Sequence, residues 1–442
     1  MTSVAKIEER IEETRRSLLE AVLSGEPLTI VKAPPGSGKT RLTLDAAGIL
    51  LAANERIAIA AQTKSQADDI CRRFVDDFGL PIVRFHSASG LPPSGLPPLV
   101  SLIAKTADLP SGPCVVVGTS AKWGLTGIPD GGFDWLLIDE AWQLANADFM
   151  LMHKVAPRFV MVGDPGQILP VVTIETARWE VAEMPPHRPA PQLILDTEPD
   201  SSCLRLELPA TRRLPADSAE IVQTFYDFDF ESAVPEGDRG IEFAAAEGAT
   251  AIDVAIDLLS SGSIAALTVP TPADGPPLEE DLEVAEIAAS VVTRVLERAQ
   301  QMKLHGNESP FGASQIGMIA THRVMNTRMR EALPPEIASE VMIDTAERWQ
   351  GLERPIMVVI HPVSGVTSPT VFDLETQRLC VMASRHQIGV IIITRDHLAT
   401  TLHELSPSAE QHPGRPDAFG AGREKHEEFW NLLVESGRVV AS

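Results

Sequence analysis

The sequence lacks a cysteine framework and any apolar run of membrane length. Its four cysteines, Cys71, Cys114, Cys203 and Cys380, are scattered and show no C-x-x-C spacing. That pattern indicates neither a cysteine-based zinc site nor a disulfide scaffold, and we expect buried thiols. Residues 1–16 are charged throughout, and no later stretch approaches the roughly eighteen apolar residues of a membrane span. The expectation is a cytoplasmic protein.

Basic residues are also scarce, with 37 Lys and Arg against 61 Asp and Glu and a net charge of −24. Binders of a phosphate backbone usually carry a basic footprint, so any such footprint here has to be local. The excess is uneven, because residues 231–290 contain thirteen acids and one base, Arg239. This acidic segment is a hypothesis for a surface that docks a protein partner. A solvated, solubilising face explains it equally well.

Short apolar runs alternate with helix-like stretches, a pattern typical of parallel sheets covered by helices. The break at 183–203 is rich in proline and turn formers, so we predict two α/β domains, 1–203 and 204–442. The expected strands are 28–33, 56–62, 114–119, 135–140 and 159–164 in the first domain, and 316–321, 356–361 and 389–394 in the second.

The sequence TIVKAPPGSGKTRLTLDAAGILL places an apolar strand, a glycine-containing loop and a helix pattern in that order. This is the context of a P-loop, whose N–H groups and helix N-terminus face phosphates. Lys39 is expected to reach the β- and γ-phosphates of ATP, and the Thr40 hydroxyl to bind Mg²⁺. A glycine turn that merely precedes a lysine is the plain alternative. The predicted cofactor-binding residues of this loop are Pro35, Gly36, Ser37, Gly38, Lys39 and Thr40.

The run WLLIDEAWQ is a further apolar strand, and it ends in Asp139 and Glu140. Open α/β sheets bind their ligands at strand ends, so Asp139 is expected in the Mg²⁺ shell and Glu140 beside the attacking water. Solvated carboxylates at a strand end are the alternative, which the P-loop makes the weaker interpretation.

DEAWQ followed by VGDPGQILP resembles motifs II and III of superfamily 1 helicases of the DEA-x-Q branch. The resemblance implies two RecA-like P-loop domains and an AAA-type NTPase that moves along single-stranded DNA or RNA. It also implies that Gln167 couples the γ-phosphate to the nucleic-acid groove. A turn residue in Gly-Asp-Pro-Gly-Gln is the alternative role of Gln167.

The second half continues in the order of that family, so the resemblance spans residues 28–394. LPATRRLP is similar to the motif in which an arginine of the second domain reaches the ATP, here Arg212. DTAERWQGLERPIMVVI is similar to motif V, which puts Glu353 at the nucleotide and Trp349 on the strand. RLCVMASRHQIGVIIIT is similar to motif VI, with Arg385 as its arginine. A forked guanidinium suits the charge that develops on a transferred phosphoryl group.

The predicted nucleic-acid contacts are Thr63 and Lys64 after the second strand, Thr119 after the VVVG strand, and Arg323. Hydroxyls at strand ends also serve as helix caps, and the basic run around Arg323 also fits a solvated helix face.

Three departures from the family pattern bear on the activity. An adenine-reading glutamine motif is missing, Thr211 stands where a tyrosine is usual, and His322 replaces a motif IV tyrosine. The favoured reading is an ATP-dependent translocase or helicase. The second is a partner-driven regulatory P-loop ATPase without unwinding activity. A P-loop kinase or small NTPase is disfavoured, because it lacks a second α/β block with two arginines.

Overall fold

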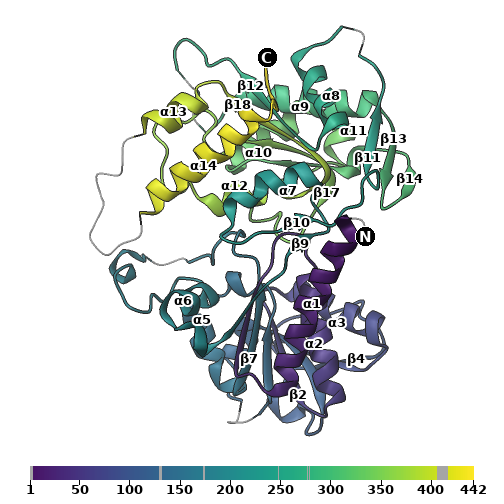
Figure 1. Ribbon diagram of the computed structural model, residues 1–442, viewed down its shortest axis with the longest axis vertical. Helices are drawn as coiled ribbons and strands as arrows, with labels where there is room; N and C mark the ends of the chain where they lie inside the picture. Colours follow the sequence, from purple (N-terminus) through teal and green to yellow (C-terminus); the bar gives the residue numbers. More distant parts are fainter. Residues whose placement is uncertain are drawn as a thin grey trace. The chain divides into compact units, whose positions relative to one another are not determined.

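The computed structural model describes residues 3–128, 132–172, 175–246, 248–275, 277, 279–405 and 417–442. The chain folds into two units. The first comprises Met1–Pro165 and Leu169–Ala210, and the second comprises Gly166–Ile168 and Thr211–Ser442. Each unit is a parallel sheet flanked by helices, which confirms the predicted α/β class with two RecA-like domains (Figure 1).

The sheet of the first unit has eight strands in the order β4-β3-β5-β2-β6-β7-β1-β8, and its strand pairs are parallel. Strands of this kind are apolar on both faces. In β2, Ile57 and Ile59 pack into one core while Ala58 and Ala60 pack into the other. The strands are β1 (Leu28–Lys32), β2 (Arg56–Ala61), β3 (Ile82–Phe85), β4 (Val100–Ile103), β5 (Cys114–Thr119), β6 (Trp135–Ile138), β7 (Arg158–Gly163) and β8 (Leu204–Glu207).

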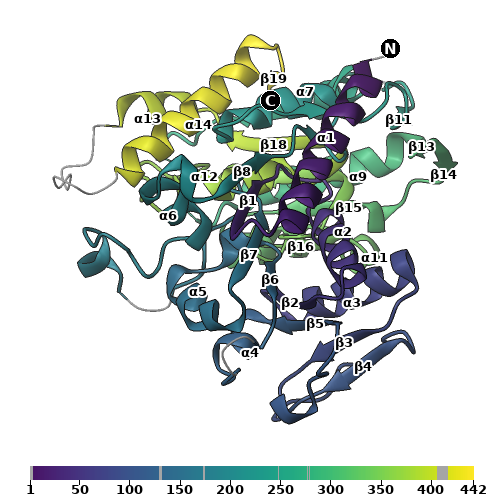
Figure 2. The same ribbon diagram turned by 60° about the horizontal axis from the view of Figure 1, so that its bottom comes forward.

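Helices cover the two faces of this first sheet. The N-terminal helix α1 is charged in sequence but amphipathic in structure, because Ile7, Ile11, Leu18 and Val22 lie on its buried side. It runs alongside α2, as Figures 1 and 2 show. The helices of this unit are α1 (Ser3–Ser24), α2 (Lys39–Ala52), α3 (Lys64–Phe78), α4 (Ser120–Gly124), α5 (Asn146–Met152) and α6 (Ala190–Thr197).

The second unit is built on six strands in the order β16-β15-β17-β18-β12-β19. Its central strand β18 is buried on both faces, with Val390 and Ile392 in one core and Ile391 and Ile393 in the other. The strands are β12 (Ile264–Val269), β15 (Ile316–Ile319), β16 (Met342–Asp344), β17 (Arg354–Ile360), β18 (His386–Arg395) and β19 (Val439–Ala441).

Further strands of the chain form two small sheets. One pairs β10 with β9, and the other runs β11-β13-β14. These strands are β9 (Ala210–Thr211), β10 (Glu231–Ser232), β11 (Gly240–Phe243), β13 (Ala299–Leu304) and β14 (Asn307–Ser309). The helices of the second unit are α7 (Ala216–Val222), α8 (Ala251–Ser261), α9 (Leu282–Arg298), α10 (Arg323–Ala332), α11 (Pro335–Ala338), α12 (Thr376–Ala383), α13 (Leu398–Glu404) and α14 (Ala418–Glu435).

The division between the units differs from the predicted boundary at residue 203. The strand β8 follows that residue, yet it pairs with β1 in the first sheet. The chain therefore changes unit at Ala210 and Thr211. The proline-rich break therefore lies inside the first unit, where it contains the helix α6 (Ala190–Thr197) and leads into β8.

The acidic segment 231–290 does not form one continuous surface. Its strand β12 is inside the second sheet, and several of its carboxylates are held by arginines. Asp253 accepts hydrogen bonds from Arg294 and Arg298, while Asp281 binds Arg395 through both oxygens. These pairs neutralise part of the charge that the sequence counts as excess.

The four cysteines are free and buried, as predicted. Burial raises the pKa of the Cys71 thiol to about 12, so this side chain stays protonated and inert at neutral pH. Across the described ranges, no helix is long and apolar enough to span a bilayer.

Candidate functional site

The loop between β1 and α2 has the backbone of a phosphate cradle. Gly36 and Gly38 have φ values of 70° and 90°, a left-handed conformation that side chains disfavour. The helix α2 begins directly at Lys39, with Gly38 as its N-cap residue. The unpaired N–H groups and positive dipole end of this helix therefore face the position that an anion would occupy.

Two residues of the loop reach strand ends of the same sheet. The Thr40 hydroxyl donates to Oδ2 of Asp139 at 3.0 Å, just beyond the end of β6. The Lys39 ammonium lies 3.6 Å from Oδ2 of Asp164, just beyond the end of β7. The first unit thus brings Lys39, Thr40 and Asp139 together, and it adds Asp164, which the sequence reading did not select. Its place after an apolar strand is the same signal that identified Asp139.

Several oxygens around this loop are buried without a hydrogen-bond partner in the described residues. Ser37 Oγ, Asp139 Oδ1 and Glu140 Oε2 have no hydrogen-bond partner among the residues that the structure describes. Burial and the Glu140 carboxylate raise the pKa of Asp139 to about 7, while Thr40 and Lys39 lower it. A bound divalent cation would favour the charged form. Hydroxyl and carboxylate oxygens are donors that Mg²⁺ prefers, so Thr40 and Asp139 fit the predicted Mg²⁺ ligands.

Glu140 has an unusual backbone for a residue other than glycine, with φ of 52°. Such left-handed residues are costly and persist where the surroundings enforce them, often at functional sites. Asp139 and Glu140 are only two carboxylates, and the described residues contain no cluster of three His, Cys, Asp or Glu that could hold a metal. A magnesium ion here would accordingly need phosphate oxygens and water to complete its shell.

Gln62 links this carboxylate end to the segments that follow β2 and β5. Its Nε2 donates to the main-chain oxygen of Asp139 at 3.2 Å, and its Oε1 accepts from Ser120 Oγ at 3.0 Å. Ser120 also donates to the carbonyl of Ala61. One amide side chain therefore connects three strand ends. Apart from its place next to Thr63, no sequence pattern identifies Gln62 as a functional residue.

A pocket of about 600 Å³ lies in the first unit beside the ends of β3 and β5. Figure 2 shows β3 and β4 at one edge of the sheet, with a long loop between them. The basic residues Lys64, Arg84 and Lys122 line this pocket against one acid, Asp68. Further lining residues include His86, Ser87, Leu91, Pro92, Pro93, Thr119, Leu125 and Thr126. Two residues predicted to contact nucleic acid, Lys64 and Thr119, thus line the same basic pocket.

The floor of this pocket is held by its own ion pair. Arg84 is buried and binds Asp68 at 2.7 Å, and it also donates to the carbonyl of Phe85. The Lys122 ammonium lies 4.0 Å above the Phe85 ring and donates to the carbonyl of Ala104. Lys64 is exposed, so its charge is the most accessible of the three.

The threonines at these strand ends act as helix caps. Thr63 and Gln66 form a capping box at the start of α3, and Thr119 Oγ1 accepts from the Lys122 N–H at the start of α4. A cap of this kind stabilises a helix by about 1 kcal/mol. Both threonines therefore have the helix-capping role that the sequence offered as the alternative. Their contact to nucleic acid stays a prediction.

Gln167 lies in the short segment Gly166–Ile168, which groups with the second unit although β7 just before it belongs to the first. Ile168 packs in a core of the second unit, and its carbonyl accepts from Gln350 Nε2 at 3.4 Å. A Cβ atom on Gly166 would clash with the Tyr226 ring and hydroxyl. The motif III loop is thus held tightly by residues of motif V and of the segment around Tyr226.

The two predicted arginines differ in their surroundings. Arg212 is exposed, whereas Arg385 is buried and its Nε donates to the carbonyl of Val381. The neighbouring Arg213 forms an ion pair with Glu353, and Gln387 donates to the other oxygen of Glu353 at 2.7 Å. Burial raises the pKa of Glu353, but the positive charges of Arg213, Arg385 and Arg239 outweigh it and keep that pKa below its usual value. Glu353, predicted at the nucleotide, is therefore engaged within its own unit.

The predicted strand contact of Trp349 does not fit this structure. The ring is fully buried, and its indole N–H donates to the carbonyl of Met318 at 3.2 Å. A side chain of this burial cannot stack on a base, so Trp349 is corrected to a core residue. Aromatic character alone does not distinguish the two roles. Arg323 is exposed at the start of α10 and keeps its prediction, whereas nearby Arg328 is paired with Glu280 and Glu331.

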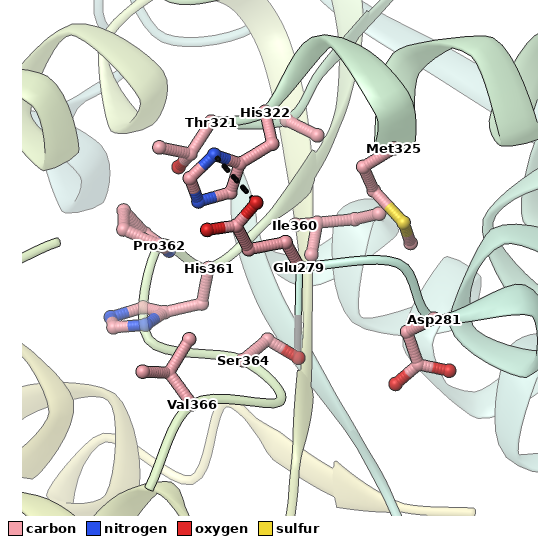
Figure 3. A pocket seen from close by; sticks show the side chains of 11 residues that line it. Glu279, Asp281, Thr321, His322, Met325, Ile360, His361, Pro362, Ser364 and Val366 are labelled. Atoms are coloured by element: carbon pink, nitrogen blue, oxygen red, sulfur yellow. Dashed lines mark ion pairs between the residues drawn. The ribbon is translucent and has the colours of Figure 1, made fainter. Parts of the chain in front are cut away.

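Figure 3 shows a second pocket, just beyond the ends of β15 and β17. The His322 imidazole lies 3.9 Å from Glu279 and 3.8 Å from Asp373. Asp281 also lines the pocket, but Arg395 holds its carboxylate. This pocket is acidic, so a phosphate group would be repelled unless the carboxylates were neutralised.

The phosphate cradle, the carboxylates at strand ends and the parallel sheets define a P-loop nucleotide-binding protein. Residues 19–173 match the family described as AAA domain. A stretch of 171 residues, 37% of this chain, is 23% identical to the DNA replication ATP-dependent helicase/nuclease DNA2 of Saccharomyces cerevisiae. These similarities and the ordered motifs support the resemblance to superfamily 1 helicases.

Solved helicase structures also match the chain at low sequence identity. The arterivirus nonstructural protein 10 (helicase) is 15% identical with a TM-score of 0.45, over 84% of this chain and 61% of that one. The PRRSV helicase is 14% identical with a TM-score of 0.43, over 86% of this chain and 55% of that one. The chain spans only 11% of the yeast relative, so the activity of that whole protein does not carry over.

Proposed function

We propose that this protein is an ATP-dependent translocase or helicase that acts on single-stranded nucleic acid. The observation that carries the proposal is the convergence of Lys39, Thr40 and Asp139 beside buried oxygens that lack partners among the described residues. Such a set suits a nucleoside triphosphate with Mg²⁺, which would neutralise charge on the phosphates when bound.

The proposed roles in hydrolysis follow from the chemistry of each group. Lys39 binds the β- and γ-phosphates, while Thr40 and Asp139 hold the metal ion. Glu140 orients a water molecule and accepts its proton, because its carboxylate lies next to the metal ligand along the chain. Gln167 senses the γ-phosphate, and its segment carries that state into the second unit, with which it groups.

Arg212 and Arg385 are proposed to complete the site when the two units close on the nucleotide. A guanidinium is always charged and binds two phosphoryl oxygens in a fixed fork. Hydrolysis would then depend on closure, and the release of closure after hydrolysis gives a two-state cycle that can move along a strand. This part of the proposal rests on the motif resemblance.

The basic pocket of the first unit is the proposed binding site for the nucleic-acid strand. It offers three bases in a chain whose net charge is −24, and it lies next to both Lys64 and Thr119. Polar lining suits the phosphodiester, and the lining residues Leu91, Pro92 and Leu125 suit the face of an unpaired base. Binding is expected to be weak and steeply salt-dependent, because few phosphates are neutralised.

Fluorescence anisotropy with labelled single-stranded oligonucleotides tests the strand site. Lys64→Ala is expected to weaken binding and to reduce the slope of affinity against salt by about one phosphate contact. Lys154→Ala is the control, because it removes an exposed lysine of the same unit that does not line the pocket. Equal binding by both variants and the wild type would remove the pocket from the proposal.

A partner-driven regulatory ATPase is the second candidate. The acidic pocket around His322 favours it, because carboxylates there oppose the passage of a polyanion over the second unit. This candidate predicts ATP turnover that single strands do not change.

A further inference from the structure

Arg239 is the one basic residue of the acidic segment, and its guanidinium binds main-chain oxygens from two distant segments. Nη2 donates to the carbonyl of Arg212 at 2.6 Å, and Nη1 donates to the carbonyl of Arg213 at 2.6 Å. Nη1 also lies 3.4 Å from the carbonyl of Gln387, at the start of β18. All of these residues belong to the second unit.

The two segments that Arg239 joins are those that carry the proposed arginines. One is the chain at Arg212, directly after β9. The other is Gln387, the second residue of β18, which lies two residues beyond Arg385. A single planar side chain therefore ties the backbone of one arginine to the strand that follows the other.

The arginines on either side of this backbone contact bind groups of the second unit. Arg213 forms an ion pair with Glu353, and the two Nη atoms of Arg239 donate to carbonyl groups. The Arg239 side chain is only 6% exposed and has Asp238 at 3.5 Å as its nearest acid. Arg212 itself remains exposed, on a backbone that is fixed at its carbonyl.

Lysine would not reproduce this arrangement. An ammonium is a point charge on a flexible stem, whereas the guanidinium presents rigid, divergent N–H groups that can bind adjacent carbonyls together. Fixing a catalytic group within a fraction of an ångström matters, because a misplacement of about 1 Å can slow a reaction about 100-fold.

We propose that Arg239 is a positioning residue for ATP hydrolysis, which holds the main chain of Arg212 in register with the start of β18 near Arg385. The inference rests on the proposed function, since it assumes that Arg212 acts on the nucleotide. Arg239 touches no nucleotide in this account. It acts through the backbone of the residue that does.

A double-mutant cycle on the full-length protein tests the proposal. Arg239→Ala is expected to lower the kcat of ATP hydrolysis about 10- to 100-fold while the KM for ATP stays nearly constant, because only the closed, reacting state needs Arg212 in place. In an Arg212→Ala background, Arg239→Ala is expected to cause no further loss. If Arg239→Ala lowered kcat by the same factor in the wild-type and Arg212→Ala backgrounds, the proposal would be overturned. Arg239 would then have a general structural role.

Two further variants keep the test decisive. Arg298→Ala is the matched control, because Arg298 is a buried arginine of the same unit that donates to the carbonyls of Ala244 and Asp253. It is expected to lower thermal stability with kcat unchanged. Arg239→Lys is expected to restore the melting temperature but only part of kcat. Unfolding of both Arg239 variants, or a matching fall in kcat for Arg298→Ala, would overturn the proposal.

The outcomes also separate this inference from the proposed function. If Arg212→Ala leaves turnover unchanged, the arginine site itself is contradicted. If Arg212→Ala slows turnover and Arg239→Ala does not, only the positioning role fails. Added methylguanidinium should raise the kcat of Arg239→Ala and leave that of Arg212→Ala in the Arg239→Ala background unchanged.

Discussion

The phosphate site of the first unit and the arginine network of the second unit differ in how many of their buried polar atoms have hydrogen-bond partners. Around the P-loop, Ser37, Asp139 and Glu140 each leave a buried oxygen without a partner among the described residues. In the second unit, Arg213, Arg239, Glu353 and Gln387 bind one another or nearby carbonyls.

This difference separates a site that a ligand completes from one that the protein completes itself. Buried polar atoms without partners cost free energy, so the first site gains when phosphate and metal arrive. In the arginine network both Nη atoms of Arg239 bind main-chain carbonyls, although its Nε has no hydrogen-bond partner among the described residues. The exposed Arg212 side chain stands on a backbone that this network holds at its carbonyl. The first unit is therefore expected to govern binding, and the second to govern the rate of the reacting state.

Lys39→Ala is the change that should break the first site most completely. The phosphates lose their point charge, and Asp164 loses the ammonium at 3.6 Å and repels the incoming anion. We expect ATP turnover to fall below detection while the circular dichroism spectrum and melting temperature stay close to the wild type. A folded Lys39→Ala protein with near-normal turnover would contradict the P-loop assignment.

Arg212→Ala should sharpen the contrast, because it removes a group proposed to act in the reacting state and leaves the residues of the P-loop unchanged. Turnover is expected to fall about a thousandfold, in line with arginine fingers of phosphoryl transfer, with little change in ATP affinity. Steady-state kinetics and nucleotide titration measure the two effects. Arg423→Ala is the control, since Arg423 lies on α14 and pairs with acids of its own helix. Equal kinetics for both variants would reject the arginine role.

Glu140→Gln should separate binding from chemistry within the first unit. The amide keeps the size of the side chain but cannot accept a proton, so turnover should fall roughly 100- to 10,000-fold with ATP still bound. Equilibrium binding of a fluorescent ATP analogue and single-turnover hydrolysis measure these effects. Glu183→Gln changes an exposed acid of the same unit and should leave both measurements unaltered. Loss of binding with a normal rate per bound ATP would make Glu140 a structural carboxylate.

Gln62→Leu should have the smallest effect, and only on the link between the two proposed ligand sites of the first unit. Its amide joins Asp139 to Ser120, which neighbours the strand-site residue Thr119. Basal ATPase is expected to change little, and stimulation by single strands to fall at least about fivefold. Gln66→Leu is the contrasting change, because the Gln66 amide belongs to the capping box of α3 and not to the link between Asp139 and Ser120. Undiminished stimulation in Gln62→Leu would exclude this link.

The sequence predicted the fold class well because the fold class depends on local patterns. Buried parallel strands read as apolar runs, and Gly36 and Gly38 stand where the backbone needs a positive φ. Contacts between segments that are distant in the sequence could not be predicted from such local patterns. Because β8 pairs with β1, the first unit extends beyond the predicted boundary. Trp349 is a core residue whose indole N–H binds the carbonyl of Met318, although its motif suggested an exposed aromatic. Arg239 and Gln62 act through main-chain oxygens, which leave no signal in side-chain identity.

The central claim is that ATP hydrolysis at this P-loop answers to single-stranded nucleic acid. The most direct measurement is the ATPase rate of the wild type with and without single-stranded DNA and RNA oligonucleotides at low salt, with Lys39→Ala as the background control. The account predicts a basal rate that one or both strands raise, a rise that salt suppresses, and no turnover by Lys39→Ala. A wild-type rate that neither strand changes at any concentration, even at low salt, would contradict the translocase and favour the partner-driven ATPase.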